Sequence, residues 1–147
     1  MRQVGIFGKR KSGKSALMYA LTNHNMTNET RYSAMEISGV GKIMLVDTMG
    51  VDVEKSTAEK SAESIEVALI LISNSSFEME LAWIVKLKHM GAKVITVISR
   101  CDKFEDGGKS LAAAVTEVSG LKPICTSAET GEGIDKLCEE IIYKLKG

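Results

Sequence analysis

Apolar runs alternate with amphipathic stretches along the whole chain. The apolar runs predict strands over Gln3–Phe7, Tyr32–Ile37, Lys42–Val46, Val67–Ile72, Lys93–Ser99 and Pro123–Thr126. The amphipathic stretches predict helices over Lys14–Leu21, Ser56–Ile65, Glu78–His89, Lys109–Val118 and Ile134–Leu145. Runs such as Ala68–Ile72 are apolar at every position, which is typical of strands buried on both faces. The pattern therefore predicts a mostly parallel sheet with helices on both sides, a three-layer α/β fold.

The second and third strands are the exception to the parallel order. Only the short, glycine-rich segment Ser38–Gly41 separates them, and such a segment favours a hairpin. We therefore expect about six strands with one antiparallel strand at an edge. The chain contains neither a linker nor a repeat, so residues 1–147 are expected to form a single domain.

The first strand runs directly into a glycine-rich motif. Its residues, G-x-x-x-x-G-K-S, are Gly8, Lys9, Arg10, Lys11, Ser12, Gly13, Lys14 and Ser15. Between a strand and a helix, this spacing lets backbone N–H groups surround phosphates while the lysine reaches the β- and γ-phosphates. Ser15 would offer its hydroxyl to Mg²⁺, and the helix N-terminus adds its positive dipole end. A chance glycine turn is the alternative, but strand, loop and helix together indicate a nucleoside-phosphate site of the P-loop type.

A second motif follows the third predicted strand. The residues Asp47-Thr48-Met49-Gly50 form D-x-x-G. Asp47 could hold Mg²⁺ through a water, and Gly50 could bring its backbone N–H close to a γ-phosphate. The same four residues can also form an ordinary turn, but their position after a buried strand and downstream of the first motif favours the functional interpretation.

Two later loops indicate which base is bound. Ser99-Arg100-Cys101-Asp102 stands where GTPases usually carry N-K-x-D. The Asp102 carboxylate can accept two hydrogen bonds from guanine N1 and N2, a contact that adenine cannot make. Arg100 could lie over the base, whereas Ser99 cannot supply the amide that tethers this loop and reaches the base edge. The segment Thr126–Ile134 fits S-A-x-x-x-x-G-I, in which a backbone N–H of Ser127 and Ala128 would bind guanine O6.

Composition adds few constraints. Lys+Arg and Asp+Glu both number 19, so the net charge of zero favours neither a nucleic acid nor an anionic membrane as partner. No apolar stretch approaches the ~18 residues of a membrane span, and no signal peptide precedes the first strand. The thiols of Cys101, Cys125 and Cys138 lack metal-type spacing, so we expect reduced cysteines and a cytoplasmic protein.

These motifs resemble the TrmE–Era branch of translation-factor-like GTPases, and within it the GTPase domain of the HydF family of [FeFe]-hydrogenase maturases. The resemblance covers nearly the whole chain. Its family-specific part is Tyr32-Ser33-Ala34-Met35-Glu36, while Ala20–Asn23, Leu45–Thr48 and Glu59–Ser61 also match. The EutP/PduV proteins are similar in length and also have a short switch I, so they remain the competing family. The resemblance implies a small G-protein fold and GTP or GDP as ligand.

The chain departs from this family in three places. In the family, a Thr-rich switch I lies between the first helix and the second strand, and one of its threonines closes over Mg²⁺. Here only residues 23–31 fill that space, so Thr27 or Thr30 would have to take this role. Val51 stands where Ras-like enzymes carry a water-orienting Gln. Lys11 stands where the branch often has an Asn that helps hold K⁺, so its ammonium could replace the ion, and K⁺ is left open. The cysteines do not reproduce the iron–sulfur ligands of HydF, so cluster binding is not inferred.

We therefore expect a slow, Mg²⁺-dependent GTPase switch. Its nucleotide site would comprise Gly8, Lys9, Arg10, Lys11, Ser12, Gly13, Lys14, Ser15, Ala16, Asp47, Gly50, Ser99, Arg100, Asp102, Ser127 and Ala128, with Lys14 and Lys11 as catalytic cations and Ser15 and Asp47 as metal ligands. A protein partner would contact residues 48–64. The alternatives are a nucleotide-binding module that hydrolyses nothing, a EutP/PduV-like protein, or a domain of a longer maturase. Oligomeric state is left open.

Overall fold

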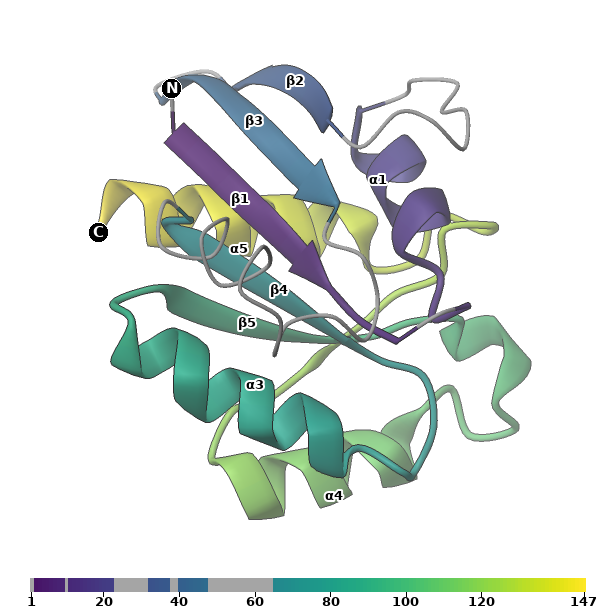
Figure 1. The fold of residues 1–147 in the computed structure, drawn as a ribbon. Coiled ribbons are helices and arrows are strands. Elements are labelled where there is room, and N and C mark those ends of the chain that lie inside the picture. Colours follow the sequence, from purple (N-terminus) through teal and green to yellow (C-terminus); the bar gives the residue numbers. More distant parts are fainter. Residues whose placement is uncertain (1, 10, 23–31, 38–39, 48–64) are drawn as a thin grey trace.

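The computed structural model describes residues 2–9, 11–22, 32–37, 40–47 and 65–147 and has six strands in one sheet, in the order β2-β3-β1-β4-β5-β6 (Figure 1). The strands are β1 (Arg2–Phe7), β2 (Tyr32–Ile37), β3 (Gly41–Asp47), β4 (Val67–Ile72), β5 (Lys93–Ile98) and β6 (Ile124–Cys125). The described helices are α1 (Lys14–Thr22), α3 (Glu78–His89), α4 (Lys109–Ser119) and α5 (Ile134–Lys146), with a 3₁₀ turn, η2 (Cys101–Lys103). This confirms the predicted three-layer α/β fold with one antiparallel edge strand.

The predicted hairpin is also confirmed. Strand β2 pairs antiparallel with β3, from Tyr32 opposite Val46 to Ile37 opposite Gly41, whereas the other pairings within the sheet are parallel. The helix expected over Ser56–Ile65 lies outside the described residues except for Ile65. Ile65 is buried two residues before β4 begins and does not lie in a helix.

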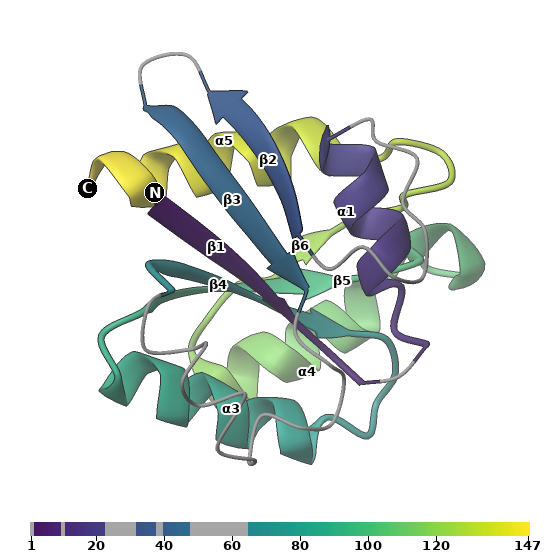
Figure 2. The same cartoon turned by 45° about the horizontal axis from the view of Figure 1, so that its top comes forward.

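The central strands divide their side chains between two cores. In β4, Leu69 and Leu71 contact a cluster that includes α1 and α5, while Ile70 and Ile72 contact a cluster that includes α3 and α4. This is the period-2 alternation of a strand with both faces covered. Figure 2 shows α1 and α5 on one side of the sheet and α3 and α4 on the other. Two buried faces explain why β4 is apolar at every position.

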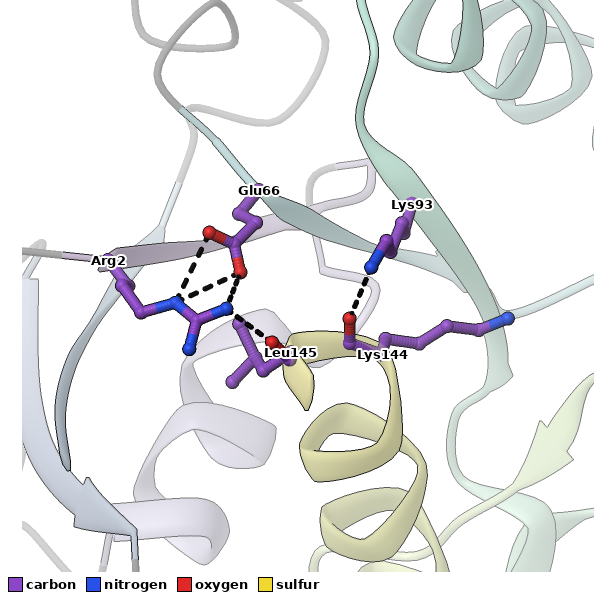
Figure 3. Close-up of polar contacts among 5 residues, drawn as sticks. All are labelled: Arg2, Glu66, Lys93, Lys144 and Leu145. Atoms are coloured by element: carbon purple, nitrogen blue, oxygen red, sulfur yellow. Dashed lines mark hydrogen bonds and ion pairs between the residues drawn. The ribbon is translucent and has the colours of Figure 1, made fainter. Parts of the chain in front are cut away.

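The end of α5 is attached to the amino ends of the strands. Arg2 donates hydrogen bonds to Glu66 and to the carbonyl of Leu145, and Lys93 Nζ donates to the carbonyl of Lys144 at 2.7 Å (Figure 3). Cations at a helix C-terminus satisfy carbonyls that lack partners within the helix and favour the negative end of its dipole. These contacts leave the opposite, carboxyl ends of the strands free for the loops that carry the motifs. No described helix is both long enough and apolar enough to cross a membrane.

Candidate nucleotide-binding site

The G-x-x-x-x-G-K-S motif forms a loop between β1 and α1. The Ser12 N–H donates to the carbonyl of Lys9 at 3.1 Å, which closes the turn, and the Leu17 N–H donates to Gly13 at 2.9 Å, which starts the helix. Gly13 has φ 98°, a conformation that L-residues rarely adopt. Lys14 Nζ donates to the carbonyls of Gly8 at 3.1 Å and Lys9 at 3.4 Å, so its ammonium lies over the loop. This is the arrangement in which a lysine can meet a bound phosphate.

Backbone strain is concentrated at the same place. Among the described residues, two non-glycine residues have positive φ, Lys11 at 61° and Arg100 at 57°. Such conformations cost free energy and cluster at ligand sites. Both residues belong to predicted nucleotide-binding motifs. The strain is therefore an independent indication that these loops serve a ligand.

A side-chain hydroxyl connects the Ser99–Asp102 loop, which is predicted to contact the base, to the phosphate-binding loop. Ser99 Oγ donates to the carbonyl of Ser12 at 2.7 Å, and both residues are buried. Position 99 lacks the amide that the usual N-K-x-D motif would supply, and the serine hydroxyl makes a hydrogen bond between the two loops in its place. Serine suffices because the two backbones come close enough for its short side chain to span them. The Arg100 guanidinium lies against the same loop, with Nε 3.6 Å from where a Cβ on Gly13 would be.

Asp102 is held as a carboxylate. The Ser127 hydroxyl hydrogen-bonds to it, and the Lys103 ammonium lies 3.5 Å from Oδ2. The Ser127 hydrogen bond first, and then the Asp102 backbone N–H and the Lys103 charge, hold the pKa of Asp102 below its ordinary value. A carboxylate that stays ionised at neutral pH accepts hydrogen bonds and donates none, as the pairing with guanine N1 and N2 requires.

Backbone hydrogen bonds connect the Ser99–Asp102 loop to the loop that begins at Thr126. Cys101 N–H donates to the carbonyl of Thr126 at 2.9 Å, and Thr126 N–H donates to that of Ile98 at 2.8 Å. Within the second loop, Gly131 N–H donates to the carbonyl of Ser127 at 2.8 Å. This network fixes the Ser127–Ala128 backbone beside Asp102 before any ligand arrives. A preformed site loses less entropy on binding.

A cavity of about 130 Å³ lies where these loops meet. It is lined by Gly13, Ala16, Leu17, Ser99, Arg100, Asp102, Lys103, Thr126, Ser127, Ala128 and Glu129. The fold thus brings three predicted motifs together around one cavity, although they are far apart in sequence. Leu17, Lys103, Thr126 and Glu129 were not among the predicted site residues. Their adjacency to predicted residues was the only signal in the sequence.

The residues that the sequence predicts as metal ligands are partly described. Ser15 is exposed in the first turn of α1, and Asp47 ends β3, where its backbone pairs in register with Ile6 of β1. This register places Asp47 beside the carboxyl end of β1, the strand that leads into the phosphate-binding loop. Hydroxyl and carboxylate oxygens are the donors that Mg²⁺ prefers, so this pair fits the ion. Arg10 and Gly50 lie outside the described residues.

A larger cavity, of about 330 Å³, lies away from these motifs. It is bounded by β5, the connection between α4 and β6, and the outer face of α5. Its polar lining includes Lys122, Lys136, Lys144 and Glu140, a set without the glycine loop or the paired base loops. The smaller cavity, which the predicted motifs line, is therefore the candidate site, and the larger one is not.

Comparison with known proteins agrees with this geometry. A family model described as 50S ribosome-binding GTPase matches residues 3–100. GTPase HflX from Methanocaldococcus jannaschii is 28% identical over 165 residues, covering 97% of this chain and 41% of the relative. GTPase Der from a Sulfurihydrogenibium species is 28% identical over 172 residues, covering 96% of this chain and 38% of the relative. The chain thus spans about two fifths of the length of these curated relatives.

Solved structures show the same fold. The FeoB G-domain from Methanococcus jannaschii superposes with a TM-score of 0.77 and 23% identity, and the match covers 100% of both chains. At this identity the likeness concerns the fold alone. The roles of the loops rest on the residues of this chain.

Proposed function

Because the chain belongs to the 50S ribosome-binding GTPase family and is a GTP-binding P-loop domain, we propose that it is a slow, Mg²⁺-dependent GTPase that alternates between GTP- and GDP-bound forms. The observation that carries the proposal is the convergence of three loops on one cavity, with Asp102 held ionised at its wall. The HydF GTPase domain is the likeness we favour within the family, on the Tyr32–Glu36 segment.

Guanine selection would rest on Asp102. Its carboxylate would accept hydrogen bonds from guanine N1–H and N2–H, while a backbone N–H of the Ser127–Ala128 segment would donate to O6. Adenine presents no donor at N1 and no N2 amine, so it would leave the Asp102 carboxylate without either of these hydrogen bonds. Arg100, already lying against Gly13, would cover the face of the base.

Phosphate binding and hydrolysis would use the first loop. Its backbone N–H groups and Lys14 would surround the phosphates, and water would attack the γ-phosphate in line with the leaving oxygen. Lys14 offsets the charge that develops on the phosphate oxygens. Mg²⁺, held by Ser15 and Asp47, would supply further charge neutralisation there. Val51 offers no group that could orient the water, which is why we expect slow turnover.

Lys11 would replace a potassium ion. Its residue is exposed in the loop, three positions before Lys14, so its ammonium could place a fixed charge near the bridging oxygen. Hydrolysis should then be the same in K⁺ and Na⁺ buffers, while Lys11→Asn should create stimulation by K⁺. A parent protein that K⁺ clearly stimulates would contradict this role and leave the GTPase proposal intact.

Calorimetry with GTP, GDP, ATP and XTP in Mg²⁺ tests the proposed ligand. We expect GTP and GDP to bind and ATP to bind far more weakly. Asp102→Asn should weaken the binding of GTP and strengthen that of XTP, because an amide is complementary to the N1–C2 edge of xanthine. Each hydrogen bond to a charged group that is lost costs about 1.5–3 kcal/mol of binding free energy. Equal affinity of the parent for ATP and GTP would reject the guanine assignment.

A nucleotide-binding module that hydrolyses nothing is the second candidate, favoured by the short 23–31 segment and by Val51. Single-turnover hydrolysis of GTP decides between the two, with Lys14→Ala as the inactive control. Phosphate release by the parent that exceeds the Lys14→Ala background supports the enzyme. Rates that coincide support the module.

The finer family assignment and the partner are also proposals. A HydF-like domain would use residues 48–64 to contact a protein partner in a nucleotide-dependent way. Replacing the GTPase domain of a HydF protein with this chain, and measuring hydrogenase maturation, tests the likeness. Loss of maturation with a folded, GTP-binding chimera would favour the EutP/PduV alternative.

A further inference from the structure

The second residue of the phosphate-binding loop is anchored outside the loop. Lys9 Nζ donates to the carbonyl of Ser76, in the connection between β4 and α3, and lies 3.5 Å from Oε1 of Glu80 in the first turn of α3. The ammonium is therefore bound to the α3 side of the sheet. Arg10, Lys11 and Lys14 remain as the other cations of the loop.

Glu80 is an unusual partner because it is buried. Its side chain is 2% exposed, against 27% for Lys9. Burial raises the pKa of Glu80, and the Lys9 ammonium opposes that rise. A carboxylate is retained in such a place only with a compensating charge, and Lys9 is the cation paired with it among the described residues. Removing either partner leaves the other poorly satisfied.

The backbone of Lys9 carries the loop's own hydrogen bonds. Its carbonyl accepts from Ser12 N–H at 3.1 Å and from Lys14 Nζ at 3.4 Å. The side chain thus fixes to α3 the same residue whose carbonyl shapes the turn and orients the lysine that meets the phosphates. A loop held at this point keeps its N–H groups directed inward without help from the ligand.

We propose that Glu80 is a positioning residue for the phosphate-binding loop, acting through Lys9 to hold the loop in its phosphate-accepting shape. The inference rests on nucleotide binding at this loop, but not on hydrolysis. Since the loop contacts the phosphates that GTP and GDP share, the effect should be equal for both nucleotides. It should appear in binding and in KM rather than in kcat.

Glu80→Gln tests the proposal, because it keeps the side chain's shape and removes its charge. We expect the Kd for GDP and GTP to rise at least 5-fold, with faster release and a kcat within 2-fold of the parent. Glu66→Gln is the matched control. It breaks another carboxylate–cation pair, with Arg2, at the opposite ends of the strands, and should change the melting temperature without changing either Kd.

Lys9→Met and the double variant separate positioning from a general loss of stability. Lys9→Met should weaken binding by a similar factor, and Glu80→Gln on that background should add nothing, because both changes break one connection. If Glu80→Gln does not fold, Lys9→Met, at a partly exposed side chain, carries the test.

Unchanged affinity in a folded Glu80→Gln or Lys9→Met variant, or additive effects of the two, would overturn the proposal. A parent that binds GDP but does not hydrolyse GTP would reject the GTPase and leave this test intact. A parent that binds neither nucleotide would reject both.

Discussion

The Ser99 hydroxyl joins the two halves of the nucleotide site. It is buried, and its 2.7 Å hydrogen bond is to a main-chain carbonyl of the other loop. Ser99→Ala should therefore leave the Ser12 carbonyl without this donor, at a cost of about 1–3 kcal/mol in the free energy of unfolding. The affinity for GTP and GDP should fall about 10-fold as the loops separate, a change of about 1.4 kcal/mol. Chemical denaturation and calorimetry measure the two effects.

Thr96 supplies the control for this prediction. It lies in β5, the strand that leads into Ser99, and is also buried, but its hydroxyl has no hydrogen-bond partner in the described part of the chain. Thr96→Val removes the hydroxyl and keeps the shape, so it should be neutral or stabilising. If Ser99→Ala and Thr96→Val behave alike, the tether carries no free energy.

The buried thiol of Cys101 should resist chemistry at neutral pH. Burial, reinforced by the neighbouring thiol of Cys125, raises the pKa of Cys101 from 9.0 to about 12. Iodoacetamide at pH 8 should therefore leave Cys101 unmodified in the folded protein and label it after denaturation, as mass spectrometry can show. Labelling at equal rates in both states would contradict its burial.

The same pKa has a consequence for stability. Because the folded value is the higher one, the unfolded chain loses this proton first as pH rises. The contribution of Cys101 is thus complete below about pH 9 and is lost as pH rises towards 12. The free energy of unfolding of the parent should therefore fall more steeply above about pH 9 than that of Cys101→Ala, as denaturation at a series of pH values can show. Parallel pH profiles for the two proteins would exclude Cys101 as the cause.

At the scale of elements, Gly133 fixes the start of α5 beside the base loops. Its φ is 75°, and an added Cβ would lie 2.0 Å from the carbonyl oxygen of Cys125. Gly133→Ala should therefore cost about 3 kcal/mol or more and weaken guanine binding, because the helix start and the Ser127 loop must move apart. Urea denaturation and GDP titration measure both effects.

Gly131 is the control for this prediction, because a substitution there would cause backbone strain without a steric clash. It also has positive φ, 85°, but an added Cβ would meet nothing within 4 Å. Gly131→Ala should cost only about 1–2 kcal/mol, the price of the left-handed conformation. Equal losses in the two variants would mean that the close approach to Cys125 does not govern the start of α5.

Prediction from sequence succeeded where periodicity is strong. The apolar runs located β1 to β5 within about one residue, and α5 starts at the predicted Ile134. It was weaker at β6, where the expected Pro123–Thr126 shortens to Ile124–Cys125, because two residues carry no period. The turn η2 was missed for the same reason. The contact of Glu80 with Lys9 could not be predicted from the sequence. An acidic residue in the first turn of a helix is common, and whether it is buried depends on the whole fold.

At the scale of the molecule, the sheet explains why the predicted motifs lie together. Parallel strands end at one edge, so motifs that follow β1, β5 and β6 must meet there once the strand order is known. The motifs and the strand order therefore indicate which loops meet before the folded structure is known. What they could not give is how the loops are held, because Ser99 and Lys9 act through backbone carbonyls whose positions only the folded chain defines.

The switch remains a prediction of the sequence, since residues 48–64 lie outside the described residues. Val51–Ser64 is rich in Glu, Lys, Ser and Ala and poor in large apolar side chains, a composition that buries little and can change its order at small cost. We expect its amide hydrogen exchange to be faster with GDP than with a non-hydrolysable GTP analogue. Peptides from the core of α5, around Leu137 and Ile141, should exchange alike in both states and serve as the internal control. Equal protection of 48–64 in the two states would remove the switch and favour the module that hydrolyses nothing, because a segment indifferent to the γ-phosphate has no means of reporting it to a partner.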